Sequence, residues 1–160
     1  MPGDASFDDG GERPLFLAAM DDEGLAVISA LAQDAVFRVS EMRWQPRRRR
    51  FAVLVNRFRW EDRARAEARG RPYERVRSLL VVDDVLAVRS QGIDRSEADM
   101  VLSLLSMAWE PGVDGAGRVL LTLAGDGAVA LEAECLDVTL QDVTRPYAAP
   151  SGRVPTHDLD

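Results

Sequence analysis

Arginine is the residue type in this chain with the clearest capacity for binding chemistry. All twenty basic residues are arginine, and thirteen of them lie between Arg43 and Arg77 beside only four carboxylates, so this segment carries +9. The whole chain carries −7, which leaves −16 for the remainder. A guanidinium forms two parallel hydrogen bonds to a carboxylate or phosphate. The asymmetry therefore predicts an anion-binding surface, or a set of internal ion pairs, in this segment.

Two strand candidates in this segment would bring four arginines together. Residues 51–60 and 74–83 alternate between apolar and polar side chains, and antiparallel pairing with Leu54 opposite Leu80 makes one face apolar. The other face then gathers four arginines at one end: Arg57, Arg59, Arg75 and Arg77. Like charges directly opposite each other destabilise a strand pair. We predict that these arginines bind an anionic group, with neutralisation by nearby carboxylates as the alternative.

The other reactive side chains offer little for catalysis. The single histidine, His157, lies in a Pro-containing tail, and the single cysteine, Cys135, is expected to be a small buried residue that cannot form a disulfide within the chain. Asp94, Glu97 and Asp99 cluster, but their spacing matches no calcium loop. Lysine is absent, which excludes lysine nucleophiles. We therefore expect no catalytic residue, no metal and no cofactor, and favour a non-enzyme.

The apolar pattern predicts one helix near the beginning of the folded part. Residues 14–20 form a short apolar run that indicates a strand. Asp21 and Asp22 then precede apolar residues at helical spacing, which predicts an amphipathic helix over about 22–34. Residues 61–72 are too charged to bury, so we expect a loop or a short exposed helix there.

Beyond Val36 the pattern is typical of strands joined by turns. Two hairpins are predicted: 76–82 with 85–90 across Asp83-Asp84, and 118–123 with 129–134 across Gly125-Asp126-Gly127. In the second hairpin, Leu121 is expected opposite Leu131. The assignment of 100–109 is open between helix and strand. A capping pattern before it favours a short helical turn leading into a strand.

These elements predict a single α+β domain made mainly of antiparallel sheet. The sheet is expected to contain about seven or eight strands, to be curled or partly closed, and to carry one N-terminal amphipathic helix. A pleckstrin-homology-like barrel is the alternative, by analogy of fold alone. Residues 14–143 would form the globular domain. The Asp/Gly-rich residues 1–13 and the Pro-containing residues 144–160 would be flexible ends.

Five stretches of the sequence resemble a known family. They lie between Leu15 and about Val143, in the expected order: LAVISALAQDAVFRV, RRRFAVLVNRFRWE, VLAVRSQGIDRSEAD, LSLLSMAWE and GAVALEAECLDVTLQDV. The family is an uncharacterised bacterial one, the domain of unknown function numbered 2948. The resemblance implies a small standalone cytoplasmic protein of alphaproteobacterial type. It implies no activity, cofactor or site residue.

Composition narrows the class of function. No run approaches the ~18 apolar residues of a membrane helix, and the first residues lack the apolar stretch of a signal peptide, so we expect a cytoplasmic protein without a membrane span. A pI near 4.8 makes nucleic-acid binding unlikely. The leading interpretation is a non-catalytic binding or assembly module that uses the arginine-rich face toward another copy or an acidic protein. The alternatives are a carboxylate/arginine enzyme acting on a small anionic substrate, and an RNA- or phospholipid-binding module.

Overall fold

β-Strands are the commonest secondary structure in residues 13–156, the part of the chain that the computed structural model describes. The strands are β1 (Phe16–Ala19), β2 (Val36–Arg38), β3 (Met42–Gln45), β4 (Arg50–Phe58), β5 (Glu74–Val82), β6 (Val85–Gln91), β7 (Val101–Pro111), β8 (Gly117–Leu123), β9 (Ala128–Ala133), β10 (Val138–Asp142) and β11 (Tyr147–Ala148). The helices are α2 (Asp22–Leu31) and α3 (Arg63–Arg69), with short 3-10 turns η1 (Val39–Glu41), η2 (Pro46–Arg48) and η3 (Trp60–Asp62).

Within residues 13–156, eleven strands form one sheet with antiparallel pairing throughout. The order is β1-β10-β5-β4-β2-β7-β8-β9-β6, with β11 added to β5 and β3 to β4. This path has two free ends, so the sheet is not a closed barrel. The α+β class and the antiparallel sheet are confirmed, whereas the count of seven or eight strands is wrong. The count rises because η1 divides the predicted run 36–44 into β2 and β3, and because β10 and β11 are short strands without strong turn signals.

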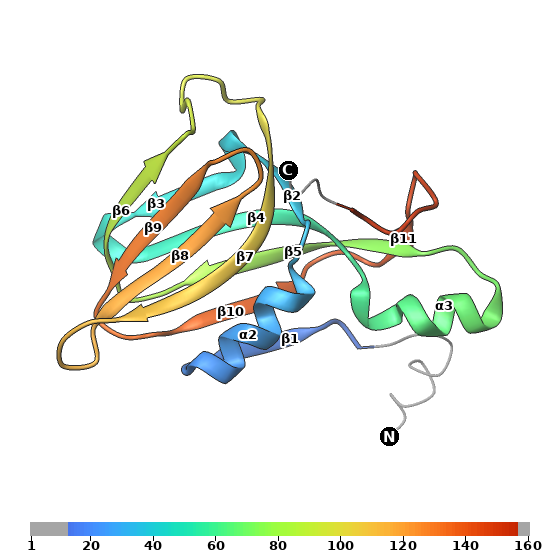
Figure 1. Cartoon of the computed structure of the whole chain (residues 1–160), viewed down its shortest axis with the longest axis horizontal. Helices are drawn as coiled ribbons and strands as arrows, with labels where there is room; N and C mark the ends of the chain where they lie inside the picture. The colour runs from blue at the N-terminus through green and yellow to red at the C-terminus, as the bar shows by residue number, and fades with distance from the viewer. Residues whose placement is uncertain (1–12, 157–160) are drawn as a thin grey trace.

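The sheet bends so that its two halves enclose one core. Figure 1 shows β7, β8 and β9 crossing over β4 and β5. Val55 and Leu80 from one half and Leu121 and Leu131 from the other all belong to the same buried cluster, together with Ile28 of α2. Burial of apolar area at roughly 25 cal/mol per Å² is the main force that holds the halves together.

Helix α2 fills the open side between the halves. Its N-cap, Asp21, accepts a hydrogen bond from a backbone N–H three residues later at 2.7 Å, and acidic residues occupy its first turn. Leu25 and Ile28 are its buried residues. The helix predicted over 22–34 is thus confirmed, but it ends at Leu31. It follows β1 within the chain rather than forming the N-terminal end, and α3 is a second helix.

Two local predictions are wrong. β5 and β6 do not pair with each other: β5 pairs with β4 and β10, and β6 pairs with β9. Residues 101–111 are strand throughout, without a helical turn. A bulge between Leu104 and Ser106 changes the spacing of the buried residues in β7 from two to three, between Leu104 and Met107. That spacing imitates a helical period, which explains why the sequence pattern was ambiguous.

The end of the described chain lies against β5. β11 pairs with β5 through Tyr147 opposite Arg75, and the neighbouring Ala149 is buried. Part of the segment 144–160, which was expected to be flexible, is therefore paired with the sheet. Residues 1–12 and 157–160, including His157, lie outside the described residues. No helix in residues 13–156 is long and apolar enough to cross a membrane.

Candidate binding surface

The four arginines predicted to share a surface do not lie together. β4 pairs with β5 one residue away from the predicted register, with Leu54 opposite Leu79 and Asn56 opposite Arg77. Because side chains alternate along a strand, this shift turns β4 over relative to β5. Arg57 is 0% exposed and Arg59 is 6% exposed. Arg75 and Arg77 point to the opposite side of the sheet, away from the core.

Arg57 is the centre of a buried ion network. Its Nη2 lies 2.9 Å from Asp142 Oδ1 and 2.8 Å from Glu61 Oε2, and its Nε donates to Ser78 Oγ at 2.9 Å. Ser78 Oγ in turn donates to Asp142 at 2.7 Å. Burial alone would lower the pKa of the Arg57 guanidinium, but the hydrogen bonds and charges of Glu61 and Asp142 outweigh it and raise the pKa. The network joins β4, β5 and β10, and so has a structural role.

A second group of ion pairs fixes the segment that leads into α3. Arg59 pairs with Glu74 at the start of β5 and lies 3.8 Å from Asp62. Asp62 accepts two hydrogen bonds from Arg71, at 2.6 and 2.7 Å. The guanidinium of Arg71 lowers the pKa of the Asp62 carboxyl below its usual value, despite the opposing effect of burial. Internal neutralisation, the alternative given for the arginine cluster, thus accounts for Arg57 and Arg59.

Stability should fall in acid partly through Glu61. Burial would raise the pKa of its carboxyl, but hydrogen bonds and charge from Arg57 lower it overall. A lowered folded-state pKa adds stability above the unfolded pKa of ~4.3, and this stability is lost as pH falls through the folded value. We expect urea midpoints of Glu61→Gln to vary less between about pH 5 and pH 3 than those of the wild type. The same pH dependence of the urea midpoint in Glu61→Gln and the wild type would contradict this. An equal reduction of the pH dependence in the control variant Glu23→Gln, which replaces an exposed carboxylate, would also contradict it.

Arg77, the exposed member of the predicted set, belongs to the side of the sheet that faces away from the core. Antiparallel partners share a face, so Phe16, Gln141, Leu79 and Leu54 form one row across β1, β10, β5 and β4. A second row passes through Arg77, Asn56 and Val36. We call this surface the outer face and define it by these residues: Phe16, Val36, Arg38, Leu54, Asn56, Arg77, Leu79, Val101 and Val143.

The outer face carries several exposed apolar side chains. Phe16 is 61% exposed, Val101 62% and Val143 49%, and Leu54 and Leu79 are half-buried beside them. Isolated exposed apolar side chains are normal, but a contiguous group rimmed by polar residues marks an interaction site. The outer face therefore has the composition of a docking surface.

A groove of about 250 Å³ opens in the outer face where β2 leaves β4. β2 pairs with β4 only at Val36, and η1 then carries the chain away before β3 resumes pairing at Met42. The gap exposes Leu54, and Arg38 and Arg77 line it together with Glu41. Within residues 13–156, neither of these two arginines forms an ion pair with a carboxylate. Their guanidiniums are available to an anionic group.

Asn56 lines the groove and is held in place by Arg75. Arg75 Nε donates to Asn56 Oδ1 at 2.6 Å, and Arg75 Nη2 donates to the Asn56 carbonyl at 2.9 Å. Asn56 Nδ2 donates to the Tyr147 hydroxyl at 2.5 Å. Burial lowers the pKa of the Arg75 guanidinium. Arg75 therefore orients a groove residue, and Arg77 is the member of the predicted set that lines the groove itself.

Comparison with known proteins identifies a family. A family model matches residues 15–157, nearly the whole chain, and is described as a protein of unknown function (DUF2948). The chain belongs to the DUF2948 family. No curated protein and no solved structure matches it. The resemblance stated from the sequence is thus confirmed, and DUF2948 membership leaves the function to be argued from the surface.

Two features of this DUF2948 chain were not visible in its sequence. Arg38 lines the same groove as Arg77 because β2 is inserted between β4 and β7, a strand order that no local pattern indicates. Cys135 is exposed, not buried as expected, and its thiol donates to Asp84 at 3.2 Å. That hydrogen bond and the neighbouring acids raise the pKa of the Cys135 thiol, which lowers its reactivity. No group of His, Cys, Asp and Glu in residues 13–156 is arranged to hold a metal ion.

Proposed function

We propose that this chain is a non-catalytic binding module whose outer face docks an acidic protein partner. The observation that carries the proposal is the groove, where Arg38 and Arg77 lack carboxylate partners among the described residues and lie beside the exposed apolar side chain of Val101. Arginine and apolar anchors are the residues that dominate the energetics of protein interfaces. The proposal places the module in the cytoplasm of a bacterium.

Charge supports an acidic partner. Arg38 and Arg77 present two guanidiniums with one carboxylate, Glu41, among the residues that line the groove. A partner with carboxylates near its apolar contacts would form charge-assisted hydrogen bonds there and would be steered by the same field. A second copy of this chain is the other candidate partner, because the sequence outside 43–77 carries −16.

The remaining alternatives find less support in the groove. An enzyme that uses paired carboxylates needs two of them at one site, and Glu41 alone lines this groove. An RNA-binding groove is expected to combine basic residues with stacking aromatic rings, and no aromatic residue except the buried Phe37 lines it. Binding of RNA nevertheless becomes an outcome of the test.

Arg38→Gln combined with Arg77→Gln should weaken docking without unfolding the protein. The probe is a synthetic peptide of alternating glutamate and leucine, titrated by calorimetry. Loss of two charge-assisted contacts should weaken binding at least ~10-fold, a change of ~1.4 kcal/mol. The matched control is Arg47→Gln with Arg48→Gln, which removes two exposed arginines from η2 and should bind as the wild type does.

Four results would contradict the proposal. The first is binding of a lysine/leucine peptide as tight as that of the acidic peptide, and the second is a loss of binding in the Arg47/Arg48 control equal to that in the Arg38/Arg77 variant. The third is binding of RNA or anionic vesicles in place of the acidic peptide. The fourth is self-association that the Arg38/Arg77 variant abolishes while peptide binding is absent. The last would identify a second copy as the occupant of the outer face. Raising the salt concentration should weaken genuine docking, because exposed charges are screened beyond about 10 Å at 0.1 M ionic strength.

A further inference from the structure

A second cleft lies where the sheet fails to close. Among the described strands, β3 pairs only with β4, and β6 pairs only with β9, so each has an edge without a strand partner. A cleft of about 260 Å³ lies between these edges. It is lined from β3 by Met42, Arg43 and Trp44, and from β6 by Val88 and Ser90.

The floor of this cleft is the hydrophobic core itself. Phe51 and Val129 line it and are only 2% and 1% exposed. Val39 is buried as well, while Met42 and Trp44 are half-buried residues that pack against the core. The gap between β3 and β6 is therefore a narrow apolar opening into the core, with an aromatic side chain on one wall.

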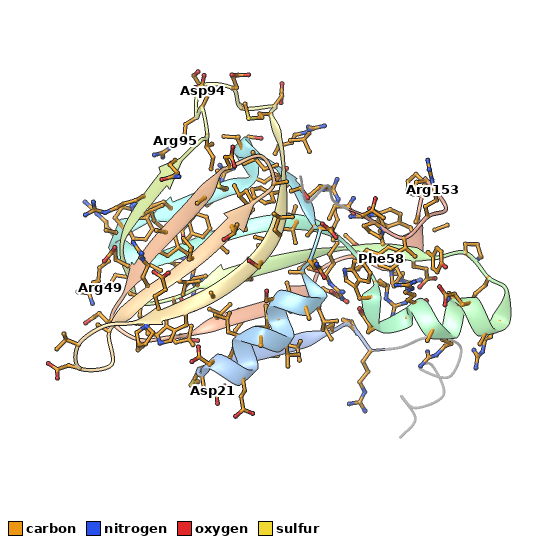
Figure 2. The ribbon with its side chains drawn as sticks, in the orientation of Figure 1. Asp21, Arg49, Phe58, Asp94, Arg95 and Arg153 are labelled. Atoms are coloured by element: carbon orange, nitrogen blue, oxygen red, sulfur yellow. The ribbon has the colours of Figure 1, made fainter. Side chains whose placement is uncertain are left out.

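The rim of the cleft is cationic and hydroxylic. Arg95 lines it from the loop between β6 and β7, and Arg43 lines it from β3, with Nη1 3.5 Å from the Ser40 carbonyl. Within residues 13–156 neither arginine forms an ion pair with a carboxylate. The adjacent Asp94 accepts hydrogen bonds from the Ser96 amide and hydroxyl. Figure 2 shows Asp94 at the tip of the loop and Arg95 below it, on the side of β6.

We propose that this cleft binds a small amphipathic carboxylate. The apolar part of the ligand enters toward Phe51 and Val129, and the carboxylate stays at the rim with Arg95 and Arg43. This orientation follows because burying an unpaired charge is costly, whereas an apolar chain gains free energy on leaving water. Ligand pockets usually span ~300–1,000 Å³, so a cleft of about 260 Å³ fits a short-chain acid. This site is separate from the outer-face groove and does not depend on the proposed docking function.

The probe is octanoate, compared with octan-1-ol and octylamine, which have the same chain and a neutral or cationic head. The readout is the NMR signal of the indole N–H, because Trp44 is the only one of the three tryptophans among the residues that line the cleft. Octanoate should shift the Trp44 signal in a saturable way and leave Trp60 and Trp109 nearly unchanged. Trp44→Phe assigns the signal.

Two variants test the two halves of the site. Arg43→Gln with Arg95→Gln should weaken octanoate binding about 10-fold and abolish the preference over octan-1-ol. Ala98→Trp places a bulky ring in the cleft without changing charge and should prevent binding of all three probes. The outer-face variant Arg38→Gln with Arg77→Gln is the matched control and should bind octanoate normally. Unfolding midpoints confirm that each variant is folded.

The proposal is overturned by any of three results. The first is octan-1-ol binding as tightly as octanoate. The second is unchanged octanoate affinity in the Arg43/Arg95 variant. The third is a failure of octanoate to saturate the Trp44 signal at about 5 mM, where a ligand with a Kd near 1 mM would be mostly bound.

Discussion

Replacing Arg57 with methionine should cost ~3–5 kcal/mol of unfolding free energy. The substitution keeps a long side chain but removes the cation that lies 2.9 Å from the buried Asp142 carboxylate. Asp142 would keep Ser78 and the Leu15 amide as donors, yet its charge would have no cation beside it and Glu61 would lose its bidentate partner. Against a total stability of ~5–15 kcal/mol this is a large loss. Urea denaturation measures it directly.

The control for this prediction is another arginine on a neighbouring strand. Arg77→Met removes an exposed guanidinium from the outer face, and a surface change of this kind should stay within ~0.5 kcal/mol. If the four predicted arginines lay together on one solvated face, Arg57→Met and Arg77→Met would each leave the unfolding free energy nearly unchanged or raise it by relieving repulsion. Equal, small effects of Arg57→Met and Arg77→Met would therefore contradict the buried network.

A double substitution separates the cost of an orphaned charge from the value of the ion pair. Asp142→Leu added to Arg57→Met removes both buried charges, and apolar replacement of a buried pair is often neutral or stabilising. The double variant should therefore be more stable than Arg57→Met alone, which gives a favourable coupling between residues in contact. Additive losses would show that Asp142 acts mainly through Ser78 and Leu15 rather than through Arg57.

The hairpin of β8 and β9 shows how far local sequence signals reach. The turn residues and the alternation predicted the hairpin and placed Leu121 and Leu131 on the buried face, and both are buried. The predicted partner was wrong by two residues, since Leu121 lies opposite Val129. A shift of two preserves which face each side chain occupies. The prediction of the core was therefore right although the pairing was not.

The pairing of β4 with β5 shows where local signals stop. A shift of one residue reverses which side of a strand faces the core. The choice between the two registers depended on whether Arg57 was assigned to the surface or to the core. An arginine in a strand is normally assigned to the surface, because burial of an unpaired charge is costly. One carboxylate partner, Glu61, lies only four residues later, but the buried partner, Asp142, lies 85 residues later on β10. Nothing local to β4 indicates that pair, so the side of β4 that faces the core could not be inferred.

The proposed docking surface depends on the same kind of information. The excess of arginine in 43–77 correctly identified a charged segment, and Arg77 does line a groove. Its companion Arg38 lies outside that segment, on a strand of three residues inserted between β4 and β7. Composition predicts that charges gather in a segment. Strand order, which is set by long-range packing, decides which of them share a surface.

The reversed face of β4 yields the second large expected effect, a contrast between two leucines. Leu80 is 1% exposed in the core, opposite Val53, so Leu80→Ala should cost ~2–5 kcal/mol through lost burial and the cavity left behind. Leu54 lies on the outer face beside Leu79, where it is half-buried and truncation leaves a shallow surface dent instead of an internal cavity. Leu54→Ala should therefore cost clearly less, ~1 kcal/mol.

The double variant shows whether these leucines touch. In the predicted register they are buried cross-strand neighbours, whose losses would be similar in size and strongly coupled. In the observed register they point to opposite sides of the sheet, so the losses from Leu54→Ala and Leu80→Ala should add within ~0.5 kcal/mol. Urea denaturation of the two single variants and the double variant supplies the three values. A Leu54→Ala loss as large as that of Leu80→Ala, with clear non-additivity, would restore the other register and return Arg57 to the surface.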